Sequence, residues 1–361
     1  MQKKSTKILV IISIVLLVIG TVILSIYFFN GNKRTNDVIS LGTDIIGKKN
    51  NEVNKNDDKN LNNSNNKNEN IYSGQERPIA VMIDNHKGAL PQAGLNDAYI
   101  TYEMIVEGGE TRLMALFKGK SLSKIGPIRS SRHYFLDYAL ENDAIYVHFG
   151  WSPQAQADIP KLGVNNINGI TAGQSASTFW RVNEKVAPHN AVTNTENIIE
   201  MAKARKYSTS SNKKSVLNYE TNEIKLDNGT KANTVTIPYS TSNTVKYTFN
   251  SETGKYTRYS KGVIQTDWDT KQNITTKNII ITFVKNTTLN DGDNKGRQTL
   301  DNIGTRDGYY ITNGNAIKIK CKKASRSEQT KYEDLQGNEI KVNNGNTFIQ
   351  ICPIDSNVTF E

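Results

Sequence analysis

Apolar and polar positions divide the chain into three stretches of different character. An uncharged apolar run covers residues 8–29, a polar stretch rich in Asn and Lys continues to residue 76, and short apolar runs separated by polar turns fill the remainder. The polar stretch has too few apolar residues to offset the entropy lost on ordering, so it is predicted to be a disordered tether over residues 30–76. The folded part is therefore expected to begin near residue 77.

The apolar run at residues 8–29 is long enough for a transmembrane helix, because about 20 helical residues cross the apolar core of a bilayer. Three lysines precede it, against Lys33 and Arg34 behind it, which favours residues 1–7 on the cytoplasmic side and the globular part outside the cell. A cleaved signal peptide is the alternative, but its apolar region is usually shorter and ends in a small-residue cleavage site. We therefore expect a single-pass membrane protein.

The cysteine count bears on the anchor and on the chemistry. Lipidation requires a cysteine just behind the apolar run, and the chain has only Cys321 and Cys352. An oxidising compartment allows these two to pair without requiring it. No histidine lies near either one in sequence, so a cysteine nucleophile is disfavoured.

The segment 77–212 mixes strand and helix signals and is predicted to be an α/β or α+β domain with a central mixed sheet. Short apolar runs predict strands at 79–83, 99–107, 111–118 and 144–149, the middle two joined in hairpin style at Gly108 and Gly109. Helical patterns cover 130–142, with a cap at Ser130 or Ser131, and also 153–162 and 195–206.

The segment 213–361 is predicted to be almost entirely strand, folded as a separate sandwich-like or barrel-like domain. Alternating or apolar runs separated by turn residues predict strands at 234–239, 245–250, 256–260, 279–285, 308–312, 316–322, 331–334, 339–342 and 347–352.

The net charge of +10 is spread thinly along the chain. Nucleic-acid binding requires a basic stripe or a recognised module, and the sequence has neither. Affinity for anionic surfaces such as lipid headgroups or wall polymers fits this charge better. No cofactor motif is present.

Polar residues gather where the predicted strands of the first domain end and where its helices begin. Such loops are where α/β folds place their ligands. The candidate ligand-binding residues are Asp84, Asn85, Glu103, Glu107, Arg112, Arg129, Arg132, His148, Trp151, Ser152, His189 and Asn190. Arg129 and Arg132 stand where a helix is expected to begin, and a helix N-terminus with two guanidinium groups suits a carboxylate or phosphate. The same arginines could instead form ion pairs with Glu103, Glu107 or Asp137.

Enzyme activity is left open by these residues. A glycosidase needs two carboxyl groups about 5–5.5 Å or about 6.5–9.5 Å apart, whereas Glu103 and Glu107 on one strand would be roughly 13 Å apart. Glu107 with Asp84 or Asp137 remains an option. Ser152 lacks the second glycine of a nucleophile elbow and better fits a helix cap before Pro153. The histidines are scattered singly, without the spacing of a zinc site.

Several long motifs stand out at residues 77–85, 91–95, 102–103, 107–112, 125–130, 150–153 and 187–190. They resemble motifs of the YerB family, a group of membrane-anchored extracytoplasmic proteins of Gram-positive bacteria with no settled activity, and the resemblance extends to the C-terminus. It implies a cell-envelope location and two domains, the second rich in strands. Two departures stand out. The lipid-bearing cysteine common in the family is missing, and Cys321 occupies a place that looks like Trp in relatives.

The sequence thus favours a binding or accessory protein of the envelope. An Arg/Glu cleft in the first domain would recognise a wall polymer, another anionic component or a protein partner. A hydrolase of wall glycan or peptide that uses Glu107 and Asp84 is the alternative.

Overall fold

The computed structural model of the protein describes residues 74–171 and 177–361. The predicted transmembrane segment at 8–29 and the predicted tether up to residue 73 lie outside this range. Among the described residues, no helix combines the length and the apolar character needed to cross a bilayer. All described residues fall within one compact unit of the chain.

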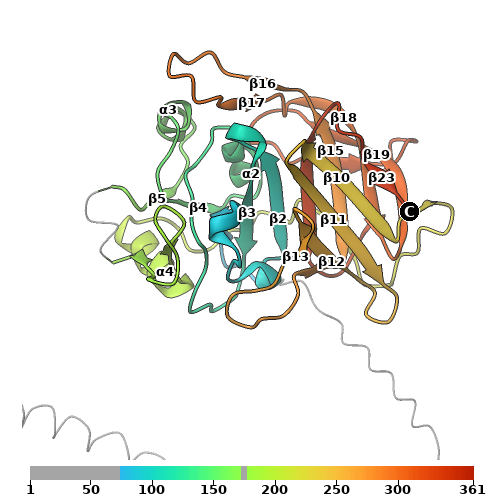
Figure 1. Ribbon diagram of the computed structural model, residues 1–361, viewed down its shortest axis with the longest axis horizontal. Helices are drawn as coiled ribbons and strands as arrows, with labels where there is room; N and C mark the ends of the chain where they lie inside the picture. The colour runs from blue at the N-terminus through green and yellow to red at the C-terminus, as the bar shows by residue number, and fades with distance from the viewer. Residues whose placement is uncertain (1–73, 172–176) are drawn as a thin grey trace, which may run out of the picture. The chain divides into compact units, whose positions relative to one another are not determined.

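An 11-stranded sheet forms the centre of the molecule and takes strands from both halves of the chain (Figure 1). Its strands are, in spatial order, β20 (Lys331–Glu333), β19 (Asn315–Lys323), β18 (Gly304–Thr312), β15 (Asn278–Val284), β22 (Thr347–Pro353), β2 (Ile100–Ile105), β3 (Thr111–Phe117), β1 (Ile79–Asp84), β4 (Ile145–His148) and β5 (Asn166–Asn168), with β9 (Thr230–Lys231) beside β19.

The fold class predicted for the globular part, an α/β domain followed by a separate sandwich-like or barrel-like domain, is therefore wrong. Strand β22 pairs in parallel with β2 on one side and with β15 on the other, so the second half of the chain continues the sheet of the first half. Every residue of β22 is buried, as expected for a strand at the centre of a sheet that is covered on both faces.

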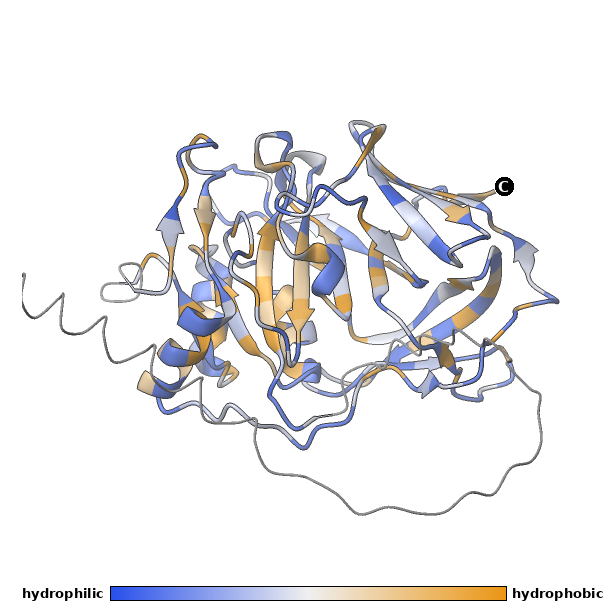
Figure 2. Cartoon of the chain, turned by 90° about the horizontal axis from the view of Figure 1, so that it is seen from below, coloured by the Kyte–Doolittle hydropathy of each residue, from blue (hydrophilic) through white to orange (hydrophobic). Residues whose placement is uncertain are grey.

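A second, six-stranded sheet contains most of the remaining long strands. It runs β13 (Val263–Ile264), β12 (Lys255–Ser260), β11 (Asn243–Asn250), β10 (Thr234–Ser240) and β23 (Thr359–Phe360), and β14 (Thr275–Thr276) pairs with β12. Buried and partly exposed residues alternate along β10 and β12, which is typical of antiparallel strands with one face toward solvent. In Figure 2, which is coloured by hydropathy, such strands appear in mixed blue, white and orange, beside the mostly orange strands in the middle of the central sheet.

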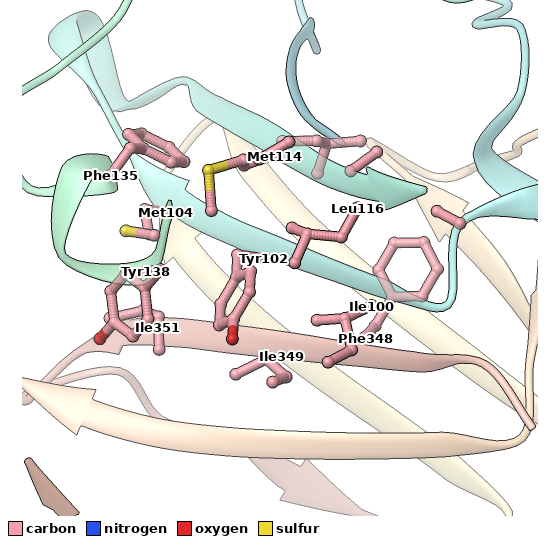
Figure 3. Close-up of a cluster of buried hydrophobic side chains, with 14 of the residues drawn as sticks. Ile100, Tyr102, Met104, Met114, Leu116, Phe135, Tyr138, Phe348, Ile349 and Ile351 are labelled. Atoms are coloured by element: carbon pink, nitrogen blue, oxygen red, sulfur yellow. The ribbon is translucent and has the colours of Figure 1, made fainter. Parts of the chain in front are cut away.

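Strand β2 shows how the central sheet is covered. Tyr102 points toward helix α2 (Phe135–Glu141), where its ring lies 4.8 Å from that of Tyr138 and its hydroxyl donates to Glu141. Figure 3 shows Ile100, Tyr102 and Met104 of β2 in the same apolar cluster as side chains of α2 and β22. The alternate residue Glu103 bonds to Arg258 of β12, in the second sheet. Successive side chains of a strand point to opposite faces, so β2 is buried on both.

The helices are few and short. Among the described residues, the α-helices are α2, α3 (Pro153–Lys161) and α4 (Thr195–Ala204). Ser152 caps α3 as predicted, and Asn194 caps α4. The helix predicted to begin at Ser130 or Ser131 begins instead at Phe135, with no side-chain cap. Ser131 pairs as an isolated β-bridge with Trp151, which keeps the preceding segment extended.

Short two-stranded ladders complete the fold. They are β16 (Asn286–Thr288) with β17 (Gln298–Leu300), β8 (Tyr219–Glu220) with β21 (Val342–Asn343), and β6 (Trp180–Arg181) with β7 (Ala191–Val192). Cys321 and Cys352 are both buried and unpaired, so the optional disulfide is not formed. Burial raises the pKa of the Cys321 thiol to about 12.

Candidate functional site

Three neighbouring strands of the central sheet place charged side chains at the same end of the sheet, where β1 and β2 finish and β3 begins. Asp84 is the last residue of β1 and lies opposite Arg112 of β3 in the antiparallel register. Glu107 follows β2, in the short 3-10 turn η3 (Glu107–Gly109) that leads into β3. Because β3 is antiparallel to both β1 and β2, its start meets their ends.

A pocket of about 390 Å³ opens at this end of the three strands. Its lining residues are Asp84, His86, Val106, Glu107, Glu110, Thr111, Arg112, Arg129, Arg132, His189, Lys295 and Arg297. Six of the twelve candidate residues from the sequence therefore meet here: Asp84, Glu107, Arg112, Arg129, Arg132 and His189.

Arg132 and Glu107 form a two-pronged ion pair on one wall of the pocket. The Nε and Nη2 atoms of Arg132 lie 2.6 Å and 2.9 Å from the two carboxylate oxygens of Glu107. Burial of Glu107 opposes its ionisation, but the hydrogen bonds and charge of Arg132 outweigh burial and lower the pKa of Glu107. Glu107 is thus held as a carboxylate that accepts hydrogen bonds.

Asp84 organises the opposite wall. Its Oδ2 atom lies 2.7 Å from Nδ1 of His189 and 3.3 Å from Nε of Arg129, and its Oδ1 accepts from the backbone N–H of His86. The rings of His86 and His189 are stacked, with centroids 4.4 Å apart and planes 11° from parallel. One carboxylate therefore holds the imidazole of His189, the guanidinium of Arg129 and the backbone of His86.

Arg112 differs from the other arginines of the pocket. Its side chain is buried, and its Nη1 donates to the backbone oxygen of Ser130. No carboxylate of the described residues lies within ion-pair distance of it. Burial, and next the charge of Arg132, lower the pKa of Arg112 to about 10, which still leaves the group charged at neutral pH.

The rim adds charges from the second half of the chain. Arg297 pairs with Asp291 at 2.5 Å and with Asp293 at 2.6 Å. Glu110 pairs with Lys261, which follows β12, at 2.5 Å. The pocket lining thus holds five cationic side chains against three carboxylates, so its charge favours an anion.

The other six candidate residues do not line the pocket. Asn85 and Glu103 lie buried beside it, where Asn85 donates to Glu103 and Glu103 pairs with Arg258. His148 is buried against Gly150 and Asn166, next to Trp151. Ser152 caps α3, and Asn190 holds Arg181. These side chains support the fold around the site.

Four charged or titratable residues of the pocket were not among the candidates. His86 directly follows Asp84 and Asn85, so the same strand-end reasoning could have included it. Glu110 belongs to the same turn as Glu107. Lys295 and Arg297 are far away in sequence, and no local signal connects them with the pocket.

Within the range that the structure describes, no three or more His, Cys, Asp or Glu side chains gather closely enough to hold a metal ion. The polar turn at 290–294 supplies Asp291 and Asp293 as ion-pair partners of Arg297.

Comparisons with known proteins agree on one family. Residues 64–208 match the model described as the N-terminal domain, and residues 235–349 the model described as the C-terminal domain, of a protein of unknown function, DUF3048. The Bacillus subtilis (strain 168) protein named "Putative lipoprotein YerB" is 32% identical over 254 residues, which cover 70% of this chain and 74% of that protein. The crystal structure of YerB from Bacillus subtilis is similar with a TM-score of 0.69 at 30% identity, covering 79% of this chain and 94% of that one. The chain therefore belongs to the YerB family, as its sequence motifs indicate.

Proposed function

We propose that this protein binds an anionic group of a cell-envelope component in the pocket around Arg112. The observation that carries the proposal is the buried guanidinium of Arg112, for which the described residues provide a backbone oxygen but no carboxylate. A buried charge that contacts no carboxylate directly is costly, and Asp84 and Glu107 act on Arg112 only from beyond ion-pair distance. A ligand oxyanion would supply a direct counter-charge.

The surrounding groups support the same chemistry. Arg129 and Arg132 have planar guanidinium groups that suit the oxygens of phosphate or carboxylate. Each already contacts a carboxylate, Asp84 and Glu107 respectively, which holds its side chain in place. Arg112 would then make the central contact and the other two would flank the ligand.

The proposed location outside the cytoplasm is inferred from the similar Bacillus subtilis protein. The similar Bacillus subtilis protein carries a lipoprotein name, and lipoproteins are held at the outer surface of a membrane. An anionic ligand in that compartment could be a phosphate-rich wall polymer or a lipid headgroup. Both carry the same oxyanion chemistry, so the experiment must separate them.

The hydrolase alternative has less support. It needs one carboxyl group that donates a proton and one carboxylate that acts as base or nucleophile. Glu107 is held by both prongs of Arg132 and its pKa is lowered, which makes it a poor proton donor. Asp84 is occupied by His189 and Arg129.

The proposal is tested by titration calorimetry of residues 74–361 with inorganic sulfate and phosphate, and by co-sedimentation with poly(glycerol phosphate)-bearing walls or phosphatidylglycerol vesicles. Arg112→Met should weaken sulfate binding at least about 10-fold, because a charge-assisted hydrogen bond contributes about 1.5–3 kcal/mol. Arg306→Met is the matched control, since Arg306 pairs with Asp301 outside the pocket.

Equal binding by the Arg112 variant and the control would refute the proposal. Binding to walls but not to vesicles would assign the ligand to a wall polymer, and the reverse to a lipid headgroup. Capture of an envelope protein through Arg112, with no binding to walls, vesicles or small anions, would favour a protein partner instead.

A further inference from the structure

The stacked imidazoles of His86 and His189 form one wall of the pocket and are not explained by anion binding through arginine alone. Their ring planes are nearly parallel at 4.4 Å. Gly88 allows this arrangement, because a Cβ atom at that position would lie 3.1 Å from Cδ2 of His189. Both rings are partly exposed and line the pocket, and the side chain of His189 is 18% exposed to solvent.

Hydrogen bonds assign a different tautomer to each ring. The backbone N–H of Gly88 donates to Nδ1 of His86, so the neutral His86 ring carries its proton on Nε2. Nδ1 of His189 lies 2.7 Å from the carboxylate of Asp84, so this nitrogen carries a proton and the neutral ring has its lone pair on Nε2. The neutral pair therefore offers one donor and one acceptor.

Protonation affects the two rings unequally. A second proton on His86 would go to Nδ1 and break the hydrogen bond from Gly88. Burial, followed by the charge of His189, lowers the pKa of His86, which agrees with this geometry. A second proton on His189 goes to Nε2 and leaves the bond to Asp84 intact. His189 is therefore the ring that can change its charge without structural loss.

The surrounding charges make this change depend on a ligand. Carboxylates that favour a charged His189 come from three positions around the pocket, namely Asp84, Glu107 and Glu110. Cations surround the ring and oppose this charge. Arg112 lies on β3, and Arg129 and Arg132 lie in the segment before α2. Lys261 follows β12, and Lys185 belongs to the loop that carries His189. Lys295 and Arg297 on the rim pair with Asp293, which reduces their influence. An oxyanion in the pocket would offset this opposition.

We propose that the pocket takes up one proton, on Nε2 of His189, together with its anion. The inference rests on the proposed anion-binding function and adds proton linkage to it. In the liganded state both His86 and His189 present N–H donors to the anion. In the neutral state the lone pair of His189 faces the anion and weakens its binding. The proton comes from solvent, and affinity rises as pH falls.

Sulfate is a suitable probe, because it does not change its own protonation near neutral pH. The chain has four histidines. Burial lowers the pKa of His133 and of His148 to about 4, so neither titrates between about pH 6 and 8, where ordinary histidines do. Proton uptake in this range can therefore be assigned to the stacked pair. Calorimetry in two buffers of different ionisation enthalpy counts the protons, and NMR titration of the imidazole C–H signals identifies the ring.

Sulfate binding is expected to take up close to one proton between about pH 6 and 8. Affinity should therefore increase by up to about 10-fold for each unit by which the pH falls across this range. His189→Asn retains an N–H for Asp84 but cannot titrate, so its sulfate affinity should be independent of pH. His133→Gln is the control and should keep the pH dependence.

Two outcomes distinguish this inference from the function on which it rests. Sulfate binding that depends on Arg112 but takes up no proton, or that shifts neither His86 nor His189 in the NMR titration, would refute proton linkage and leave anion binding intact. Failure of sulfate to bind at any pH in this range would overturn both.

Discussion

The guanidinium of Arg258 on β12 and the carboxylate of Glu103 on β2 form an ion pair of 2.6 Å in which neither side chain is exposed to solvent. Arg258 also donates to the hydroxyl of Tyr247, and Glu103 accepts from Asn85 and Thr111. This network joins the second sheet to the central sheet directly beside the pocket. The pair therefore contributes to the support of the candidate site without lining it.

Arg258→Met should destabilise the protein strongly. The substitution leaves the Glu103 carboxylate buried without a counter-charge, and breaking a buried pair in this way costs about 3–5 kcal/mol. Urea unfolding of residues 74–361 measures the change. The double variant Glu103→Leu/Arg258→Met should recover part of the loss, since it removes both charges. A loss below about 1 kcal/mol for the single variant would show that the pair is not a major support.

Arg112→Met should behave in the opposite way in the absence of ligand. Arg112 is buried like Arg258 but has no carboxylate partner among the described residues, so removing its charge relieves a desolvation cost and loses one bond to Ser130. The free energy of unfolding should stay within about 1 kcal/mol of the parent or rise. A loss as large as that of Arg258→Met would identify Arg112 as a structural residue.

The turn that carries Glu107 offers a matched pair of glycines. Gly108 and Gly109 both have positive φ, at 68° and 73°. A Cβ atom at 108 would meet nothing within 4 Å, whereas one at 109 would lie 2.7 Å from Oγ and 2.8 Å from Cβ of Ser240. Gly108→Ala should therefore cost only about 1 kcal/mol of backbone strain.

Gly109→Ala should cost clearly more than Gly108→Ala and should also weaken sulfate binding, because the turn must move away from Ser240 and take Glu107 and Arg132 with it. Thermal unfolding and calorimetry of the two variants provide the comparison. Equal effects of the two substitutions would contradict the contact with Ser240.

Stability should fall between pH 6.5 and 4, and His148 is one of the histidines responsible. Burial lowers its pKa from 6.5 to about 4, so the unfolded state binds a proton that the folded state excludes, and stability decreases as pH falls through this window. The full loss from this residue is on the order of 3 kcal/mol, at about 1.4 kcal/mol per pKa unit. His148→Gln should reduce the slope of unfolding free energy against pH by about one proton. An unchanged slope would exclude His148 as a source of acid sensitivity.

Local patterns were sufficient for much of the secondary structure. The alternation in β10 and β12 and the apolar runs of β15 and β22 identified strands, because side-chain period and burial are properties of a short segment. The cap and Pro153 identified the start of α3. Ser130 and Ser131 gave the same kind of signal wrongly, since tertiary pairing of Ser131 with Trp151 keeps that segment extended.

The sequence allowed half of the pocket residues to be recognised, because they lie at or near the ends of predicted strands. It did not reveal the direction in which each side chain points. His148 ends β4, which runs parallel to β1, yet its side chain is buried rather than facing the pocket. Glu103 sits within β2 on the face toward Arg258. Strand register and the face of the sheet on which a side chain lies determine whether it reaches the pocket. Both depend on pairing with neighbouring strands.

The sequence by itself determined the strand-rich character of the chain, its family and the clustering of arginines and carboxylates near the ends of β1 and β2. Each of these depends on composition or on residues close together in the chain. Only the tertiary structure decided that β22 pairs with β2 and joins both halves in one sheet, that Lys295 and Arg297 reach the pocket, and that Arg112 is buried without a carboxylate. These features arise from contacts between residues far apart in sequence, whose pairing is selected by burial of the whole core rather than by any local pattern.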